Sequence, residues 1–216
     1  MSGYPSPNFG DRRGATTPIF VVLHYTAMGN CAEARARLCD PSAEVSAHWL
    51  ISEMGQAEAL VEETYRAWHA GAGEWAGLSD VNSHSIGIEL VNSGSQPFAE
   101  PQMTALETLL QGIMARWAIP PHRIIAHSDM APSRKRDPGP RFDWRRLALG
   151  GLSVWPQPGQ ADATAFLPAL RAFGYPDAPE ADLLSAFRLR FRPWAAGPVG
   201  AIDAGLAVDL GQRFPT

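Results

Sequence analysis

The chain has 216 residues, of which 45% are hydrophobic, and a formal net charge of −4 at pH 7. This length allows one large domain, or one medium domain followed by a small one, with a full hydrophobic core. The slightly acidic balance and the lack of an extended basic stretch argue against nucleic acid as a partner. We therefore expect a globular protein that acts as a monomer and does not bind nucleic acid.

The start of the chain bears on its location in the cell. Residues 1–17 are polar and rich in Gly and Pro, without the apolar segment of a signal peptide. The apolar run Ile19–Leu23 is too short to cross a bilayer. Cys31 and Cys39 lie eight positions apart in an expected helix, which suits neither a zinc knuckle nor a disulfide, so we interpret them as reduced thiols. These features predict a cytoplasmic protein without membrane insertion; a periplasmic or exported protein is the alternative if a signal has been removed.

Apolar runs predict three strands in the first part of the chain. Ile19–Thr26 is almost continuously apolar, as in a strand buried on both faces, and His24 lies near its C-terminal end. Ala32–Leu38 is expected to be a short helix, and Val45–Ser52 and Ala57–Val61 are expected to form two further strands. Ligands gather at the C-terminal ends of strands in open α/β sheets, so His24 is a candidate site residue.

An aromatic, glycine-rich stretch precedes a fourth strand. Thr64–Gly77 has little regular pattern and is a candidate wall of a substrate groove. His84–Val91 is the fourth strand, and its period of two places Ile88 and Glu89 on opposite faces. A carboxylate within such a strand is costly unless it is paired or near a metal, which makes Glu89 a candidate functional residue. The alternative interpretation is a Glu at a strand end in water.

The remaining pattern defines the fold class. Pro101–Trp117 has apolar residues at helical spacing, and Phe142–Leu149 is expected to be a short helix. Strands interleaved with helices predict an α/β domain with a central mixed β-sheet flanked by helices. Gly150–Gln160 has the composition of a linker.

Beyond the linker the pattern is helical only. Three amphipathic segments predict a small three-helix bundle, over Ala161–Phe173, Ala181–Phe191 and Asp203–Gly211. We therefore expect a catalytic domain over residues 1–150, a linker over 151–160 and a helical domain over 161–216.

Two further candidate ligands follow the short buried strand Ile124–Ala126. His127 lies at its end, and Asp137 precedes Pro-Gly, with Lys135 two residues before it. Together with His24 they supply two imidazoles and a carboxylate, the kind of ligand set that a hydrolytic zinc site uses. Each feature alone also fits a structural role, such as a turn residue or a solvated basic run. The chain has no HExxH and no CxxC motif, so a helix-borne protease site and a zinc knuckle are not expected.

Six segments taken together resemble the type 2 family of N-acetylmuramoyl-L-alanine amidases, zinc enzymes related to peptidoglycan recognition proteins and to phage lysozymes that are amidases. The segments, in the family's order over most of residues 15–150, are VVLHYTA, VSAHWLI, AWHAG, SIGIELVN, IIAHSDMAP and KRDPGP. The later segments LPALRAFGY and LLSAFRLRFRP resemble a peptidoglycan-binding three-helix module.

The resemblance implies an activity and a set of roles. The family's zinc ligands fall on His24, His127 and Asp137, for one zinc ion per chain, and its catalytic residues fall on Glu89 and Lys135. The implied reaction is hydrolysis of the amide between the lactyl group of N-acetylmuramic acid, or of its 1,6-anhydro form, and L-alanine. The implied substrates are peptidoglycan fragments (muropeptides) in cell-wall recycling.

One departure from the phage branch of the family bears on the base. A tyrosine precedes the histidine of the second strand in that branch, whereas Ala47 precedes His48 here, so the base role passes to Glu89, as in the recycling branch. His48 is then expected to be structural. The residues expected to line the substrate groove are Trp68, His69, Ala70, Gly71 and Arg134.

Three other functions compete with this interpretation. A non-catalytic peptidoglycan recognition protein shares the fold, but an intact ligand set argues against it. An exported amidase that trims the intact wall is favoured by the wall-binding tail, whereas the missing signal peptide favours recycling. A zinc peptidase that cuts within the stem peptide fits the tail and the aromatic groove less well.

Overall fold

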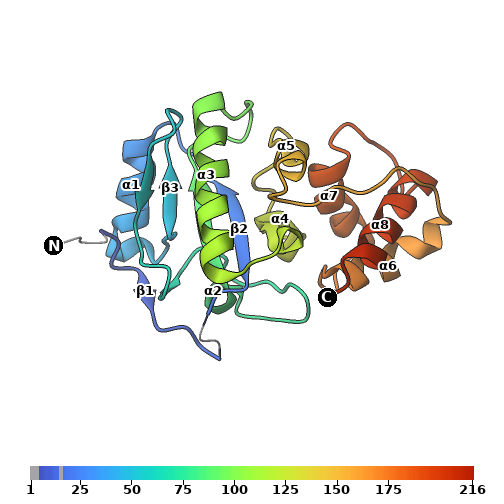
Figure 1. The fold of residues 1–216 in the computed structure, drawn as a ribbon, viewed down its shortest axis with the longest axis horizontal. Helices are drawn as coiled ribbons and strands as arrows, with labels where there is room; N and C mark the ends of the chain where they lie inside the picture. The colour runs from blue at the N-terminus through green and yellow to red at the C-terminus, as the bar shows by residue number, and fades with distance from the viewer. Residues whose placement is uncertain (1–4, 15–16) are drawn as a thin grey trace.

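The computed structural model describes residues 5–14 and 17–216; residues 1–4, 15 and 16 of the polar N-terminal stretch lie outside this description. A five-stranded sheet has the strand order β4-β3-β6-β2-β7. Two of its strands, β2 and β3, are labelled in Figure 1. Its strands are β2 (Phe20–Tyr25), β3 (Trp49–Ile51), β4 (Ala57–Ala59), β6 (Ser85–Leu90) and β7 (Ile124–Ala126). Only β4 pairs antiparallel, at one edge, so the sheet is mixed, as predicted.

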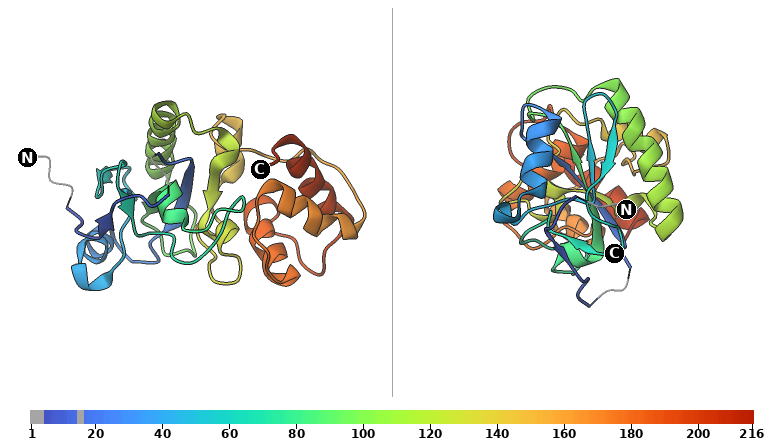
Figure 2. Two further views of the ribbon diagram at one scale, coloured as in Figure 1. Left: turned by 90° about the horizontal axis from the view of Figure 1, so that it is seen from below. Right: turned by 90° about the vertical axis from the view of Figure 1, so that its left-hand side faces the viewer.

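Helices surround this sheet and continue beyond it. They are α1 (Cys31–Cys39), α2 (Val81–His84), α3 (Glu100–Trp117), α4 (His127–Met130), α5 (Trp144–Leu149), α6 (Phe166–Phe173), α7 (Glu180–Phe191) and α8 (Ala201–Arg213). Short 3-10 turns lie at Pro41–Ala43, Pro121–Arg123 and Ala163–Ala165. The helices α6, α7 and α8 gather at the opposite end of the molecule from α1 (Figure 2). The predicted α/β fold class with a C-terminal three-helix unit is confirmed.

Side-chain alternation along the strands divides the core into two layers. On one face, apolar side chains of β2 and β6 pack against the apolar stripe of α3; the buried set includes Val21, Leu23, Ile86, Ile88, Leu106, Leu110 and Ile113. On the other face, α1 packs against Leu50 and Val91, and Phe20 and Val22 belong to a hydrophobic cluster that extends to the C-terminal helices. The same face of the sheet carries His24 and Glu89.

Some local predictions differ from the structure. The predicted strand Val45–Ser52 is shorter in the structure, where β3 begins at Trp49; Ser46 bonds outside the sheet, its N–H donating to the carbonyl of Trp68. His84 ends α2 and does not begin β6. The pairing of β1 (Phe9–Gly10) with β5 (Arg66–Ala67) was not predicted.

The segment predicted as a linker is partly built into the core. Leu152, Ser153 and Val154 are buried, and the Ser153 hydroxyl accepts a hydrogen bond from Arg190 at 3.1 Å. One hydrophobic cluster joins sheet residues such as Phe20 to residues of the C-terminal helices such as Phe166. The predicted domain boundary at residues 151–160 therefore stays a prediction.

Candidate active site

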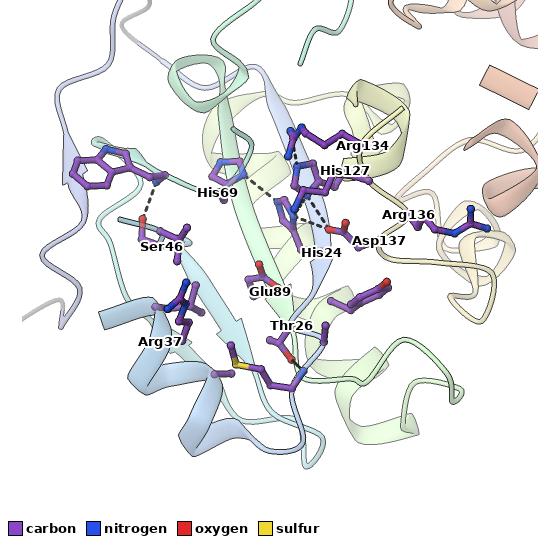
Figure 3. Close-up of a pocket in the computed structure, with 18 residues that line it drawn as sticks. His24, Thr26, Arg37, Ser46, His69, Glu89, His127, Arg134, Arg136 and Asp137 are labelled. Atoms are coloured by element: carbon purple, nitrogen blue, oxygen red, sulfur yellow. Dashed lines mark hydrogen bonds and ion pairs between the residues drawn. The ribbon is translucent and has the colours of Figure 1, made fainter. Parts of the chain in front are cut away.

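The site lies where three parallel strands end. His24 on β2 is directly opposite Glu89 on β6 in the register, so their side chains emerge on the same face. β7 pairs with the other side of β2 and ends at Ala126, which places His127 at the same edge of the sheet. Asp137 returns from the following loop, where its carbonyl accepts a hydrogen bond from the N–H of Ser128. Residues from four segments therefore meet in one place (Figure 3).

Three of these side chains converge on a single point. The Nδ1 atoms of His24 and His127 are 2.8 Å apart, and Oδ2 of Asp137 lies 3.0 Å from the first and 2.9 Å from the second. All three side chains are buried. The structure thus brings together the three metal ligands implied by the sequence resemblance.

The protonation states of these groups suit a metal site. Burial and the neighbouring His127 lower the pKa of His24 to about 4, so the imidazole is neutral at pH 7. Burial alone would raise the pKa of Asp137, but its contacts with His127 and His24 hold that pKa far below the ordinary range, so the carboxylate is ionised. A neutral imidazole and an ionised carboxylate are the forms that bind metal.

The geometry also fits zinc. A tetrahedral zinc ion with bonds of about 2.0 Å keeps its ligand atoms about 3.3 Å apart, close to the 2.8 to 3.0 Å found here. Hydrogens on the two nitrogens cannot satisfy all three edges of this triangle, whereas a cation satisfies them together. A set of two nitrogens and one oxygen also matches hydrolytic zinc sites, which leave a fourth position open for water.

Glu89 faces this site from β6. Its Oε2 atom is buried and has no hydrogen-bond partner among residues 5–14 and 17–216. Burial and then the charge of Asp137 raise the pKa of Glu89 to about 8, and Lys135 opposes this shift. An unpartnered carboxylate with a raised pKa beside a metal-ligand cluster is suited to proton transfer.

A cavity of about 470 Å³ opens over these residues. Its lining includes the three candidate ligands and Glu89, together with Lys135. Arg37 on α1 lies across the pocket from Arg134 and Arg136 (Figure 3). The cationic side chains around the rim suit a substrate that carries carboxylates.

The residues predicted to line the groove separate into two groups. Trp68, His69 and Arg134 line the cavity, whereas Ala70 and Gly71 are outside its lining. Ala70 is fully buried, and its carbonyl accepts hydrogen bonds from Arg134 and from the His127 ring. The roles of all five in binding substrate stay predictions.

Several contacts near the site were not predicted from the sequence. Arg37 lies one position before the buried Leu38 on α1, and only the packing of that helix shows that it faces the cavity. Asn82 is buried, and its Oδ1 accepts hydrogen bonds from the N–H groups of His69 and Ala70. His48, expected to be structural, accepts from the N–H of Gly87 through Nδ1. No local pattern marks Asn82, because its partners lie 12 and 13 positions away.

Comparison with known proteins defines the class. Residues 14–140 match the sequence profile of the N-acetylmuramoyl-L-alanine amidases, and the chain belongs to this family of enzymes. The chain is 36% identical over 208 residues to N-acetylmuramoyl-L-alanine amidase AmiD of Escherichia coli, covering 80% of this chain and 74% of that protein. It is 44% identical over 159 residues to 1,6-anhydro-N-acetylmuramyl-L-alanine amidase AmpD of Haemophilus influenzae, covering 65% of this chain and 86% of that protein.

Solved structures extend the likeness to the C-terminal helices. Escherichia coli AmiD in complex with anhydro-N-acetylmuramic acid-L-Ala-D-γ-Glu-L-Lys gives a TM-score of 0.84 at 32% identity, over 96% of this chain and 98% of that one. AmpDH3 of Pseudomonas aeruginosa gives a TM-score of 0.83 at 29% identity, over 100% of this chain and 97% of that one. The whole arrangement of sheet and C-terminal helices is therefore shared with amidases.

Over residues 5–14 and 17–216, no helix combines the length and the apolar character needed to cross a bilayer.

Proposed function

We propose that the chain is a zinc-dependent amidase that cleaves the bond between the lactyl group of 1,6-anhydro-N-acetylmuramic acid and L-alanine in muropeptides. One zinc ion per chain would be held by Nδ1 of His24, Nδ1 of His127 and Oδ2 of Asp137. The observation that carries this proposal is the closed triangle of these three atoms, with contacts of 2.8 to 3.0 Å.

Each remaining group in the pocket has a chemical task. Zinc, when bound, supplies a Lewis acid and lowers the pKa of a coordinated water. The positive charge of zinc would lower the pKa of Glu89 from its zinc-free value of about 8 and favour the ionised carboxylate. Glu89 then accepts a proton from the attacking water and later delivers it to the amine of the leaving L-alanine. The Lys135 ammonium lies in the same cavity and offsets negative charge that develops on the carbonyl oxygen.

The substrate class is supported by the relatives and by the charges of the pocket. The structure of AmiD holds an anhydromuramoyl tripeptide, and a structure of AmpDH3 holds an anhydromuramic pentapeptide. The guanidinium groups of Arg37, Arg134 and Arg136 are placed to meet carboxylates of a stem peptide. We propose that the chain acts as a monomer on such fragments during cell-wall recycling in the cytoplasm. Trimming of the intact wall by an exported form is the alternative.

We further propose that the C-terminal helices bind the glycan part of peptidoglycan. A second cavity of about 540 Å³ is lined by α7, by the loop after it and by Arg136, which also lines the active-site cavity. Trp194 in that loop is 74% exposed, and an exposed indole is a suitable surface for a sugar ring. Arg136 lines both cavities, which supports a proposal that one extended substrate contacts both.

Digestion of purified muropeptides tests the reaction. The enzyme is incubated with fragments that carry the anhydro end and with matched fragments that carry a reducing end, and products are identified by mass spectrometry. We expect free stem peptide from both and faster release from the anhydro form. Equal rates would favour wall trimming, and cleavage within the stem peptide would show that the bond is assigned wrongly.

A further inference from the structure

The ring of His24 makes a second contact on the side away from the metal-ligand triangle. Its Nε2 lies 3.1 Å from Nδ1 of His69, whose own Nε2 lies 3.2 Å from the hydroxyl of Ser85. The Ser85 hydroxyl donates its hydrogen to the carbonyl of Val81 at 2.5 Å. Its oxygen is therefore left to accept the hydrogen on Nε2 of His69.

This series of hydrogen bonds determines the tautomer of His24. A neutral His69 that carries its hydrogen on Nε2 has an acceptor at Nδ1. His24 must then donate from Nε2, which leaves a lone pair on the Nδ1 atom that faces His127 and Asp137. The hydrogen is placed by this network of partners, since the ring atoms alone do not reveal it.

Ala70, the residue after His69, determines the tautomer of the second histidine ligand, His127. Nε2 of His127 lies 2.9 Å from the carbonyl oxygen of Ala70. A carbonyl oxygen only accepts, so the ring hydrogen of His127 is on Nε2 and the lone pair is on Nδ1. The Ala70 carbonyl also accepts from Arg134 at 2.7 Å, which fixes its direction.

The segment that makes both contacts is itself held in place. Oδ1 of Asn82 accepts from the N–H of His69 at 2.9 Å and from the N–H of Ala70 at 2.8 Å. The His69 ring lies directly on β6 at Gly87, where an added Cβ would come within 2.3 to 2.6 Å of ring atoms. A glycine inside a strand is unfavourable by itself, and here it makes room for the imidazole.

We propose that the dipeptide His69–Ala70 is the positioning element of the metal centre, setting the tautomer and orientation of both histidine ligands. His69 acts on His24 through its imidazole, and Ala70 acts on His127 through its carbonyl. Partners of this kind usually change metal affinity by about 10- to 100-fold when they are removed. The inference rests on the proposed zinc site, and it assigns His69 a task other than contact with substrate.

Nitrogen-15 NMR of the unmodified, zinc-free protein tests the tautomers directly. Long-range proton–nitrogen spectra distinguish Nδ1–H from Nε2–H rings. We expect His24, His69 and His127 all to carry their hydrogen on Nε2. A His24 or His127 ring that carries its hydrogen on Nδ1 and none on Nε2 would overturn the inference, whatever the protein's affinity for zinc.

Zinc affinity measured by chelator competition supplies the second readout, on two variants of matched shape. His69→Asn keeps an acceptor near the position of Nδ1, whereas His69→Leu has the same branching and no acceptor. We expect His69→Leu to weaken zinc binding about 10- to 100-fold and His69→Asn to restore most of the loss.

The outcomes separate the two proposals. A parent protein that binds no zinc would contradict the proposed function, while the tautomers would still be tested by NMR. A parent that binds zinc, with both variants binding equally well, would overturn the positioning role alone. Where His69→Leu does not fold, Gly87→Ala serves instead, because it displaces the ring without removing it.

Discussion

Arg190 on α7 and Asp129 on α4 form an ion pair at 2.5 Å in which neither side chain is exposed to solvent. Asp129 lies two residues after His127 and also accepts from the N–H of Ala126 and from the hydroxyl of Tyr175. The C-terminal helices therefore contact the one-turn helix that begins with a proposed zinc ligand.

Arg190→Met is expected to destabilise the protein by about 3–5 kcal/mol, because it leaves the Asp129 carboxylate buried without its cation. Denaturant unfolding measures the change. Arg213→Met is the matched control, since Arg213 pairs with Asp209 at the surface and its loss should cost less than about 1 kcal/mol. Equal losses of unfolding free energy in the two variants would show that the buried ion pair stabilises the protein no more than the surface pair does.

Removal of residues 161–216 is expected to unfold the remainder. The truncation removes the C-terminal helices from the hydrophobic cluster that they share with Phe20 and Val22, and it takes away the partner of Asp129. Circular dichroism and analytical ultracentrifugation of the truncated chain measure the result. A monomeric, folded and active remainder would instead support the predicted boundary at residues 151–160.

The raised pKa of Glu89 predicts a pH dependence of stability in the zinc-free protein. The ordinary pKa is 4.5, and in the folded protein it is about 8, so between these values the folded state holds a proton that the unfolded chain releases. Stability from this group is complete below pH 4.5 and is lost as the pH rises through 8. Glu89→Gln should remove this loss.

The test compares the urea midpoints of the parent and of Glu89→Gln at pH 5 and pH 8. The buried histidines change the pH dependence of stability equally in both proteins, so the difference between the two proteins reports on Glu89. The same variant should keep its zinc and lose turnover by about 10²- to 10⁴-fold. Full activity of Glu89→Gln would rule out Glu89 as the base.

Lys135→Met keeps most of the apolar stem and removes the charge from the pocket. We expect zinc content to be unchanged and kcat to fall by about 10²-fold, as for the loss of one group that stabilises an oxyanion. Lys135→Arg, which keeps a cation, should retain more activity. A change in KM alone would instead mark Lys135 as a substrate-binding residue.

Prediction from the sequence succeeded where the signal is local. The continuous apolar run of β2, the alternation of β6 and the helical stripe of α3 each specify their own element. The convergence of His24, His127 and Asp137 followed from the places of the two histidines at strand ends, from the place of Asp137 on the following loop, and from the family resemblance.

Features that depend on distant partners could not be predicted. Arg190 lies in the segment FRLRF, and an arginine in such a helical segment is typical of a solvated surface. In the structure it is buried against Asp129, 61 positions away. Residues 151–160 have the composition of a linker, which gives no sign that Leu152 is buried. The strand β1 has only two residues, too few to show a sequence pattern without its partner β5. The contact between His69 and His24 spans 45 positions and has no local signature.

The most direct test of the account is the zinc content of the purified protein. The protein is dialysed against zinc and then against metal-free buffer, and its zinc is measured by elemental mass spectrometry. The account predicts one zinc ion per chain in the parent and none in Asp137→Ala, with chelation abolishing hydrolysis and added zinc restoring it. A parent that retains no zinc, or an Asp137→Ala protein that retains as much as the parent, would contradict it.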